Sequence, residues 1–276
     1  MLASYLLSLR EGIEAALIVG IVLGALRQMR RRELSPAVWL GVISAAAISL
    51  ATAILLSRFG LALEGTAEPI FEGLTMILAA ILLTWMIFWM SKAGRTLKSD
   101  LEADVHRAAN TAGKRALFFV AFLAVLREGI ELALFLTASV FASNAAQTIF
   151  GAFLGLGTAI LLGWSLFATT VRLDLHRFFQ VTGLLLILFA AGLIAHGVHE
   201  FNEVGWIPAI IEHVWDVNPI LNEKSLGGEL LTALFGYNGN PSLTEILAYL
   251  AYLITVFFAI RGGQNKVTGT VAETQA

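Results

Sequence analysis

The sequence predicts an all-α polytopic membrane protein with seven transmembrane helices. Of its 276 residues, 58% are hydrophobic and 14% are charged, and the mean hydropathy is +0.80. Soluble domains contain roughly 45–50% apolar and about 25% charged residues, so this composition is typical of a chain surrounded by lipid. A second observation is a repeat, because LREGIEAAL at 9–17 returns as LREGIELAL at 126–134. Ionisable residues at membrane depth mark functional sites, and here they occur twice at identical spacing.

Seven apolar stretches are long enough to cross a bilayer, which takes about 20 residues. They are residues 2–26, 36–57, 69–90, 115–141, 146–171, 178–200 and 243–260. The first lacks a basic n-region and a small-residue cleavage site, so we interpret it as a retained helix rather than a signal peptide. We expect a single permease domain over 1–262, followed by a cytoplasmic tail without regular structure at 263–276.

The charges in the connecting loops predict the orientation. Of the 18 Lys and Arg residues, 14 flank the loops on one side of the membrane and only Arg58 and Lys224 lie on the other. This bias places the N-terminus outside and the C-terminus in the cytoplasm. The outer segment 201–242 is acidic and contains two apolar runs, IPAIIEHVW and GELLTALFGY, which we expect to form short helices at the membrane interface.

The two copies of the nonapeptide lie three spans apart, so they run in opposite directions through the membrane. Residues 2–90 and 115–200 therefore read as a 3+3 inverted repeat, with the seventh helix outside it. A second, weaker similarity between the two halves supports this interpretation: GLTMILAA at 73–80 resembles GLLLILFA at 183–190. Inverted repeats place the substrate site near the midplane. Gly20-x-x-x-Gly24 and Gly151-x-x-x-Gly155 are spacings that permit close helix approach.

Within each motif the two acids share one helix face, and the Arg lies within reach of the second acid. The first copy supplies Arg10, Glu11 and Glu14, and the second supplies Arg127, Glu128 and Glu131. A two-fold axis would bring four carboxylates and two guanidinium groups together with a formal charge of −2, and an all-oxygen site of this kind suits hard cations. The alternative is a pair of buried salt bridges that lock helices together. One Arg–Glu ion pair is enough to hold two helices together. Two copies of a cluster with an extra acid are therefore poorly explained by a purely structural role.

The doubled L-R-E-G-I-E resembles the R-E-x-x-E signature of the oxidase-dependent iron permeases, which comprise fungal high-affinity permeases and bacterial EfeU-type proteins. The similarity extends to residues 71–92, to the segment around Glu203 and to residues 225–237. The resemblance implies a transporter rather than an enzyme, located in the cell inner membrane. Iron would be a transported substrate, with no permanently bound cofactor. Its ligands would be Glu11, Glu14, Glu128 and Glu131, supported by the charges of Arg10 and Arg127.

The resemblance also implies an extracytoplasmic iron-oxidising partner, either a periplasmic EfeO-like protein with an EfeB-like haem peroxidase or another ferroxidase. A site of charge −2 would be neutralised by Fe²⁺, whereas hard carboxylate oxygens favour Fe³⁺. We favour ferric iron at the site and ferrous iron as the external supply. The sequence contains no basic face and no nucleic-acid-binding motif, so we do not expect nucleic acid as a partner. The remaining expected partner is the lipid bilayer, and assembly into a homo-oligomer is left open.

Several residues near the outer face are candidates for an access path. Glu72 matches the EfeU-type pattern and is either a secondary ligand or a snorkelling interfacial acid. His199 and Glu203 are spaced i, i+4, which suits a metal relay or an interfacial hydrogen-bonded cluster that includes His196. Pro69 suggests that Glu68 lies just outside the third helix. Glu245 reads as an acid in the first turn of the seventh helix, and Trp85 and Trp89 read as interfacial belt residues.

Two other functions compete with iron uptake. One is transport of a different hard cation such as Mn²⁺ or Ca²⁺, which spacing alone does not exclude. The other is an intramembrane di-iron oxidase, but such sites use Glu-x-x-His pairs and the two motif helices contain no His. The chain has no Cys, which excludes thiolate metal sites, disulfides and a Cys nucleophile.

Overall fold

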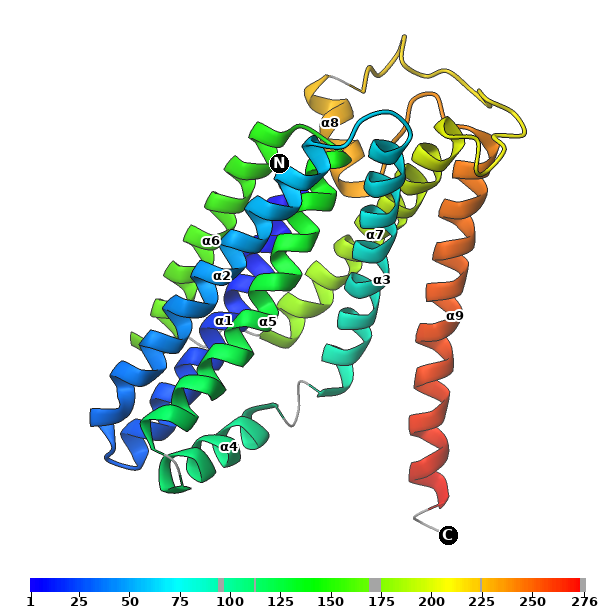
Figure 1. Ribbon diagram of the computed structural model, residues 1–276. Helices are drawn as coiled ribbons and strands as arrows, with labels where there is room; N and C mark the ends of the chain where they lie inside the picture. The colour runs from blue at the N-terminus through cyan, green and yellow to red at the C-terminus, as the bar shows by residue number, and fades with distance from the viewer. Residues whose placement is uncertain (94–96, 112, 169–174, 224, 274–276) are drawn as a thin grey trace.

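The computed structural model describes the whole chain except residues 94–96, 112, 169–174, 224 and 274–276. The described residues form helices and connecting turns with no strand, so the predicted all-α class is confirmed. The helices are α1 (Leu2–Gln28), a 3₁₀ turn (Arg32–Leu34), α2 (Ser35–Leu61), α3 (Ala67–Ala93), α4 (Leu97–Thr111), α5 (Lys114–Phe141), α6 (Ala145–Ala168), α7 (Leu175–Glu203), α8 (Leu226–Phe235) and α9 (Leu243–Glu273). Figure 1 shows the long helices as one elongated bundle.

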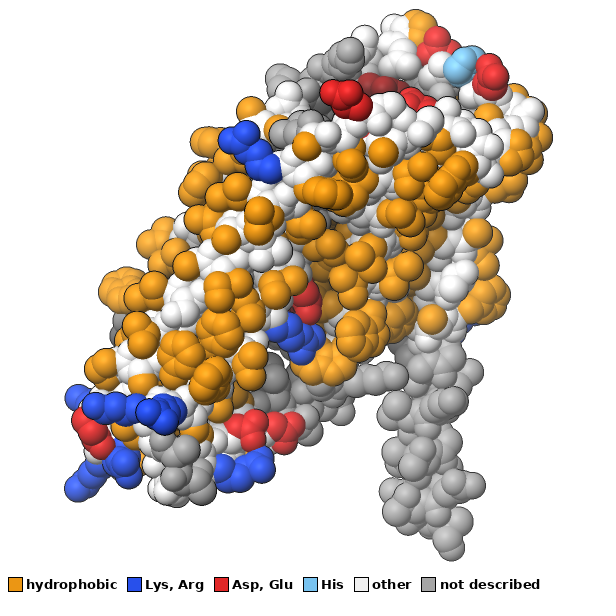
Figure 2. Space-filling view, in the orientation of Figure 1, with side chains coloured by type: hydrophobic (Ala, Val, Ile, Leu, Met, Phe, Trp, Pro, Cys, Tyr) orange, Lys and Arg blue, Asp and Glu red, His pale blue; other side chains and the backbone are white. Residues whose placement is uncertain are grey.

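Five stretches are long and apolar enough to cross a membrane: Arg32–Gly60, Ala67–Met90, Ala145–Ser165, Arg177–Glu203 and Leu243–Arg261. They lie on α2, α3, α6, α7 and α9. Helices α1 and α5 are as long but carry the Arg and the two Glu of the motif. Figure 2 shows a broad apolar band across the middle of the visible face, interrupted by a few blue and red side chains, with most charged side chains at the two ends.

The motif helices α1 and α5 pack against each other and run in opposite directions (Figure 1). Helix α1 packs along α6, and α5 packs along α2. At Gly12 an added Cβ would lie 2.6 Å from the Cβ of Ala159 on α6, and at Gly129 it would collide with the Oγ of Ser49 on α2. Each motif therefore contains a glycine at the place where its helix packs closely against a neighbouring helix, α6 for α1 and α2 for α5.

Of the glycines in the two pairs proposed for close packing, Gly151 and Gly155 confirm the prediction. They lie against the backbone carbonyls of Met1 and Tyr5, so a side chain at either position would collide with α1. Gly24 has open space around it, so the expected close approach does not occur at that residue. The spacing alone does not reveal which face of a helix has a neighbour.

The bundle has two chemically different ends. The α8 end contains the N-terminus, α8 and the segment 204–242, and acidic and histidine side chains gather on it (Figures 1 and 2). The α4 end contains α4, the start of α2 and the start of α5. Helix α4 was not anticipated, because its sequence is polar and was read as a loop. Its Val105, Ala108 and Ala109 are buried against α1 and α5, which is the one-sided apolar spacing of a surface helix.

Three further boundaries differ from expectation. Residues 207–215 are irregular rather than helical, since Pro208 interrupts the run, whereas the second apolar run does form α8. Helix α3 begins at Ala67, so Glu68 lies inside its first turn. Pro69 is tolerated there because first-turn N–H groups have no intrahelical acceptor. The expected tail continues α9 as far as Glu273, because extending an existing helix is easier than nucleating one.

Candidate metal site

The acids of the two motifs meet between α1 and α5. Glu11, Glu128 and Glu131 each present a carboxylate oxygen, and these oxygens all lie within 4.8 Å of one another. Glu11 and Glu128 are buried, with 1% and 6% of their surface exposed. We call these three residues the carboxylate site. Their spacing on two antiparallel helices, rather than any local turn or loop, brings them together.

Four of the six oxygens of the carboxylate site lack hydrogen-bond donors. Both oxygens of Glu11, and the Oε2 atoms of Glu128 and Glu131, are buried without a partner. A buried polar atom without a partner is costly, and a buried charge without a counter-charge costs more. A cation held by these oxygens would remove that penalty, so the donor set suits a hard metal ion.

Each arginine pairs with the second acid of its own motif. Arg10 Nε lies 3.1 Å from Glu14 Oε1, and Arg127 Nε lies 3.0 Å from Glu131 Oε1. Glu14 interacts electrostatically with Glu11 and Glu131 but contributes no oxygen to the close group of three. The expected set of four acids is therefore arranged as three converging acids and one neighbour held by Arg10.

The two guanidinium groups meet different aromatic rings. Arg127 stacks on Trp89, with 4.3 Å between the guanidinium carbon and the ring centroid, while Arg10 lies 5.9 Å from the ring of Phe179. Trp89 was read as an interfacial belt residue, and its contact with Arg127 shows a second role. The sequence carried no signal for this pair, because the two residues lie on helices that are far apart in the chain.

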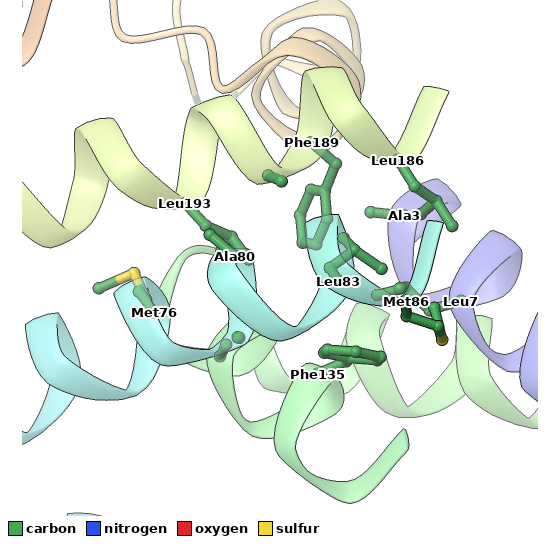
Figure 3. Packing of buried hydrophobic residues seen from close by; sticks show 13 residues of the cluster. Ala3, Leu7, Met76, Ala80, Leu83, Met86, Phe135, Leu186, Phe189 and Leu193 are labelled. Carbon is green, nitrogen blue, oxygen red and sulfur yellow. The ribbon is translucent and has the colours of Figure 1, made fainter. Parts of the chain in front are cut away.

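A pocket of about 120 Å³ borders the site on the side of the α4 end. Glu14, Arg127 and Glu128 line it, together with Trp89 and Leu101. On the side of the α8 end, the space is filled by a cluster of buried apolar side chains that we call the apolar plug. The plug includes Leu7, Leu83, Met86, Phe135 and Leu186 (Figure 3). The carboxylate site thus adjoins a pocket on one side and packed side chains on the other.

Leu7 and Phe135 connect the plug directly to the motif helices. Leu7 precedes Glu11 by one helical turn on α1, and Phe135 follows Glu131 by one turn on α5. Neither side chain has any exposed surface. Both side chains therefore lie packed in the interior of the bundle, one turn from the acids of the carboxylate site.

The other candidates lie at the α8 end, away from the carboxylate site. His199 lies between two acids: its Nδ1 is 3.0 Å from Glu245 Oε1 and its Nε2 is 3.6 Å from Glu203 Oε1. Glu72 is half-buried on α3 and interacts electrostatically with Glu203. Glu245 lies in the first turn of α9, as expected, where it forms a capping box with Ser242.

Comparison with known proteins places the sequence in a family. The pattern of the Iron permease FTR1 family matches residues 1–264. The chain is 36% identical over 261 residues to the ferrous iron permease EfeU of Escherichia coli O6:K15:H31 (strain 536 / UPEC), covering 94% of this chain and 95% of the relative. It is 35% identical over 256 residues to the ferrous iron permease EfeU of Yersinia pestis, covering 92% and 91%. No solved structure matches the chain. The resemblance is confirmed, and the chain belongs to the FTR1 family of iron permeases, which are membrane transporters rather than enzymes.

Proposed function

We propose that this protein carries iron across the cell inner membrane into the cytoplasm and binds it at the carboxylate site between α1 and α5. The observation that carries the proposal is the meeting of Glu11, Glu128 and Glu131, with oxygens within 4.8 Å and several of them lacking donors. The two relatives described above are named ferrous iron permeases, which supports iron as the cargo.

The charge of the site suits a multivalent cation. Four acids and two arginines give a formal charge of −2, which Fe²⁺ would neutralise, while carboxylate oxygens favour the harder Fe³⁺. We propose that ferrous iron is the external supply and that ferric iron occupies the site after oxidation by an EfeO-like and EfeB-like partner or another ferroxidase. The arginines orient Glu14 and Glu131 and lower the mutual repulsion of the acids.

We further propose that α1 and α5 also cross the membrane, which gives seven spans with the N-terminus outside and an inverted repeat. Arg10, Glu11, Glu14 and Glu128 are buried in the bundle, where intramembrane charges are tolerated. The matched contacts Gly12–Ala159 and Gly129–Ser49 support a two-fold relation between the halves. The chain contains no Cys, so single cysteines report the orientation cleanly. In intact spheroplasts, Glu64→Cys at the α8 end should react with an impermeant maleimide and Ala103→Cys on α4 should not. The opposite pattern would reverse the topology.

Transport then requires alternating access to the carboxylate site. The pocket on the α4 side gives the acids a route toward the cytoplasm, while the apolar plug closes the route from the α8 end. This arrangement corresponds to an inward-facing state, and movement of one half of the repeat against the other would open the opposite side.

The test is iron uptake into proteoliposomes that contain the purified full-length chain. If iron is the cargo, we expect it to enter at least about tenfold faster than Mn²⁺, Zn²⁺ or Ca²⁺, a preference that corresponds to about 1.4 kcal/mol. Glu128→Gln should abolish iron uptake, whereas the exposed Glu64→Gln at the α8 end should keep it. Equal uptake of Mn²⁺ or Ca²⁺ would instead identify a general hard-cation transporter.

A further inference from the structure

A second set of possible metal ligands lies at the α8 end, on the last two turns of α7. A cavity of about 760 Å³ opens there between Met1, the turn after α5 and the segment 213–240. His196 and His199 line it from α7, and His213 and Glu223 line it from the outer segment. Ten residues of α1, or about 15 Å of helix, separate Met1 at this cavity from Glu11. We call this space the histidine cavity.

Hydrogen bonds to acceptors fix which ring nitrogen of each histidine carries the proton. His196 Nδ1 lies 2.9 Å from the carbonyl oxygen of Gly192. A carbonyl oxygen can only accept, so Nδ1 donates the proton and Nε2 of the neutral ring keeps its lone pair. His199 Nδ1 lies 3.0 Å from Glu245 Oε1 and donates to that carboxylate in the same way.

This is the arrangement found around metal-ligating histidines, which donate their second ring N–H to a carboxylate or a backbone carbonyl. The carboxylate behind His199 is itself held in place: Asn238 Nδ2 donates to Glu245 Oε2 at 2.7 Å, and the Ser242 N–H donates to Oε1 at 3.1 Å. Glu245 is 3% exposed. The support of both rings at Nδ1 therefore comes from the Gly192 carbonyl and from a buried, fixed carboxylate, and each ring has its Nε2 atom left for a ligand on the other side.

Spacing along α7 gives His199 an oxygen partner, and His196 lies about one helical turn before it. His199 and Glu203 are spaced i, i+4 and share one face of the helix. His199 Nε2 lies 3.6 Å from Glu203 Oε1. Two ligands that bind one tetrahedral ion at about 2.1 Å each are about 3.4 Å apart, so this separation suits a shared metal ion.

We propose that His196 and His199, assisted by Glu203, bind a divalent first-row transition-metal ion of the Fe²⁺ class at the histidine cavity. Imidazole nitrogen suits such ions, whereas Mg²⁺ and Ca²⁺ prefer oxygen. The site differs in donor type from the carboxylate site, which is all oxygen. That the bound ion is the cargo, waiting on the outer side of the apolar plug, rests on the proposed function. The binding itself does not.

Binding is tested by titrating Co²⁺, a spectroscopic probe for imidazole ligands, into the detergent-purified full-length chain carrying Glu11→Gln and Glu128→Gln. These substitutions remove two ligands of the carboxylate site, so that the remaining bound Co²⁺ reports the histidine cavity. We expect His199→Gln and His196→Gln each to weaken this binding at least about tenfold, since even an outer-shell partner is worth 10–100-fold. Glu245→Gln should weaken it through His199. His106→Gln is the matched control, because His106 is an exposed histidine on α4 at the opposite end.

The result is independent of transport. Unchanged Co²⁺ affinity and stoichiometry in the double variant His196→Gln/His199→Gln would overturn the site, as would displacement of Co²⁺ by an equal concentration of Ca²⁺. Gel filtration with wild-type elution confirms that each variant is folded. If the cavity binds Co²⁺ as expected but wild-type proteoliposomes take up no iron, the proposed function fails and the metal site stands.

Discussion

The two copies of the nine-residue motif have the same internal geometry and different surroundings. In both, the Arg Nε atom lies about one hydrogen-bond length from the Glu four residues later, at 3.1 Å in α1 and 3.0 Å in α5. The side chain of Arg10 is 1% exposed and that of Arg127 is 41% exposed. Arg127 also stacks on Trp89 and lines the pocket on the α4 side.

The comparison separates the Arg–Glu ion pair, which depends on the helix alone, from the exposure of the arginine, which depends on the neighbouring helices. The ion pair follows from the i, i+4 spacing, so it appears in both copies. Exposure depends on the neighbouring helices, so it differs between them. The arginine of the first copy is enclosed by neighbouring helices, whereas the arginine of the second copy reaches the surface of the bundle.

The largest effect should come from the acids without a cationic partner of their own. Glu11→Gln and Glu128→Gln each keep the shape but remove one buried ligand charge. Outer-shell partners are worth 10–100-fold, so loss of a ligand should lower the initial iron uptake rate by at least about 100-fold. The measurement is uptake into proteoliposomes at matched protein content. A wild-type rate in either variant would show that the two helices do not share one site.

A smaller asymmetry is expected between the paired acids. Glu131 contributes an oxygen to the close group of three, whereas Glu14 does not. Both Gln variants should insert normally and transport poorly, with Glu131→Gln the more severe by about tenfold, the lower limit for a partner close to a metal. If Glu14→Gln is the more severe in the same uptake assay, the ion sits nearer α1 than the structure places it.

The arginines should differ in stability more than in transport. Arg10→Ala leaves Glu14 buried without its counter-charge, and breaking a buried pair typically costs about 3–5 kcal/mol. Arg127→Ala removes a partly exposed pair and should cost less than about 1 kcal/mol. Thermal unfolding in detergent measures both. Arg→Lys at either position should insert normally yet lower uptake, because a Lys has no planar guanidinium group and so loses the Nε–H that donates to the carboxylate. Wild-type uptake in both Lys variants would make the guanidinium geometry irrelevant.

The smallest effect on iron uptake should come from Trp89, the aromatic ring on which Arg127 of the second copy stacks. Trp89→Leu removes a contact worth about 0.5–1 kcal/mol, which corresponds to a loss of roughly two- to fivefold in uptake. Trp85→Leu is the matched control, since Trp85 lies on the same helix with 62% of its surface exposed. Equal rates in the two variants would remove Trp89 from the site.

Much of this protein follows from local pattern. Apolar length predicted the long helices, and α3 and α5 begin and end within three residues of the spans expected for them. The polar helix α4 was missed because its burial of Val105 and Ala108 depends on docking against α1 and α5. The region around Pro208 was misread because apolar composition was given more weight than a helix breaker.

The sequence by itself determined the membrane class, the family and the Arg–Glu pair within each motif, because helical spacing places residues four apart on one face. Only the tertiary structure decided which acids converge, which arginine is exposed, and where the plug and the pocket lie. It also placed Glu245 behind His199. These contacts join helices that are distant in the chain, and no short-range periodicity encodes which faces will meet.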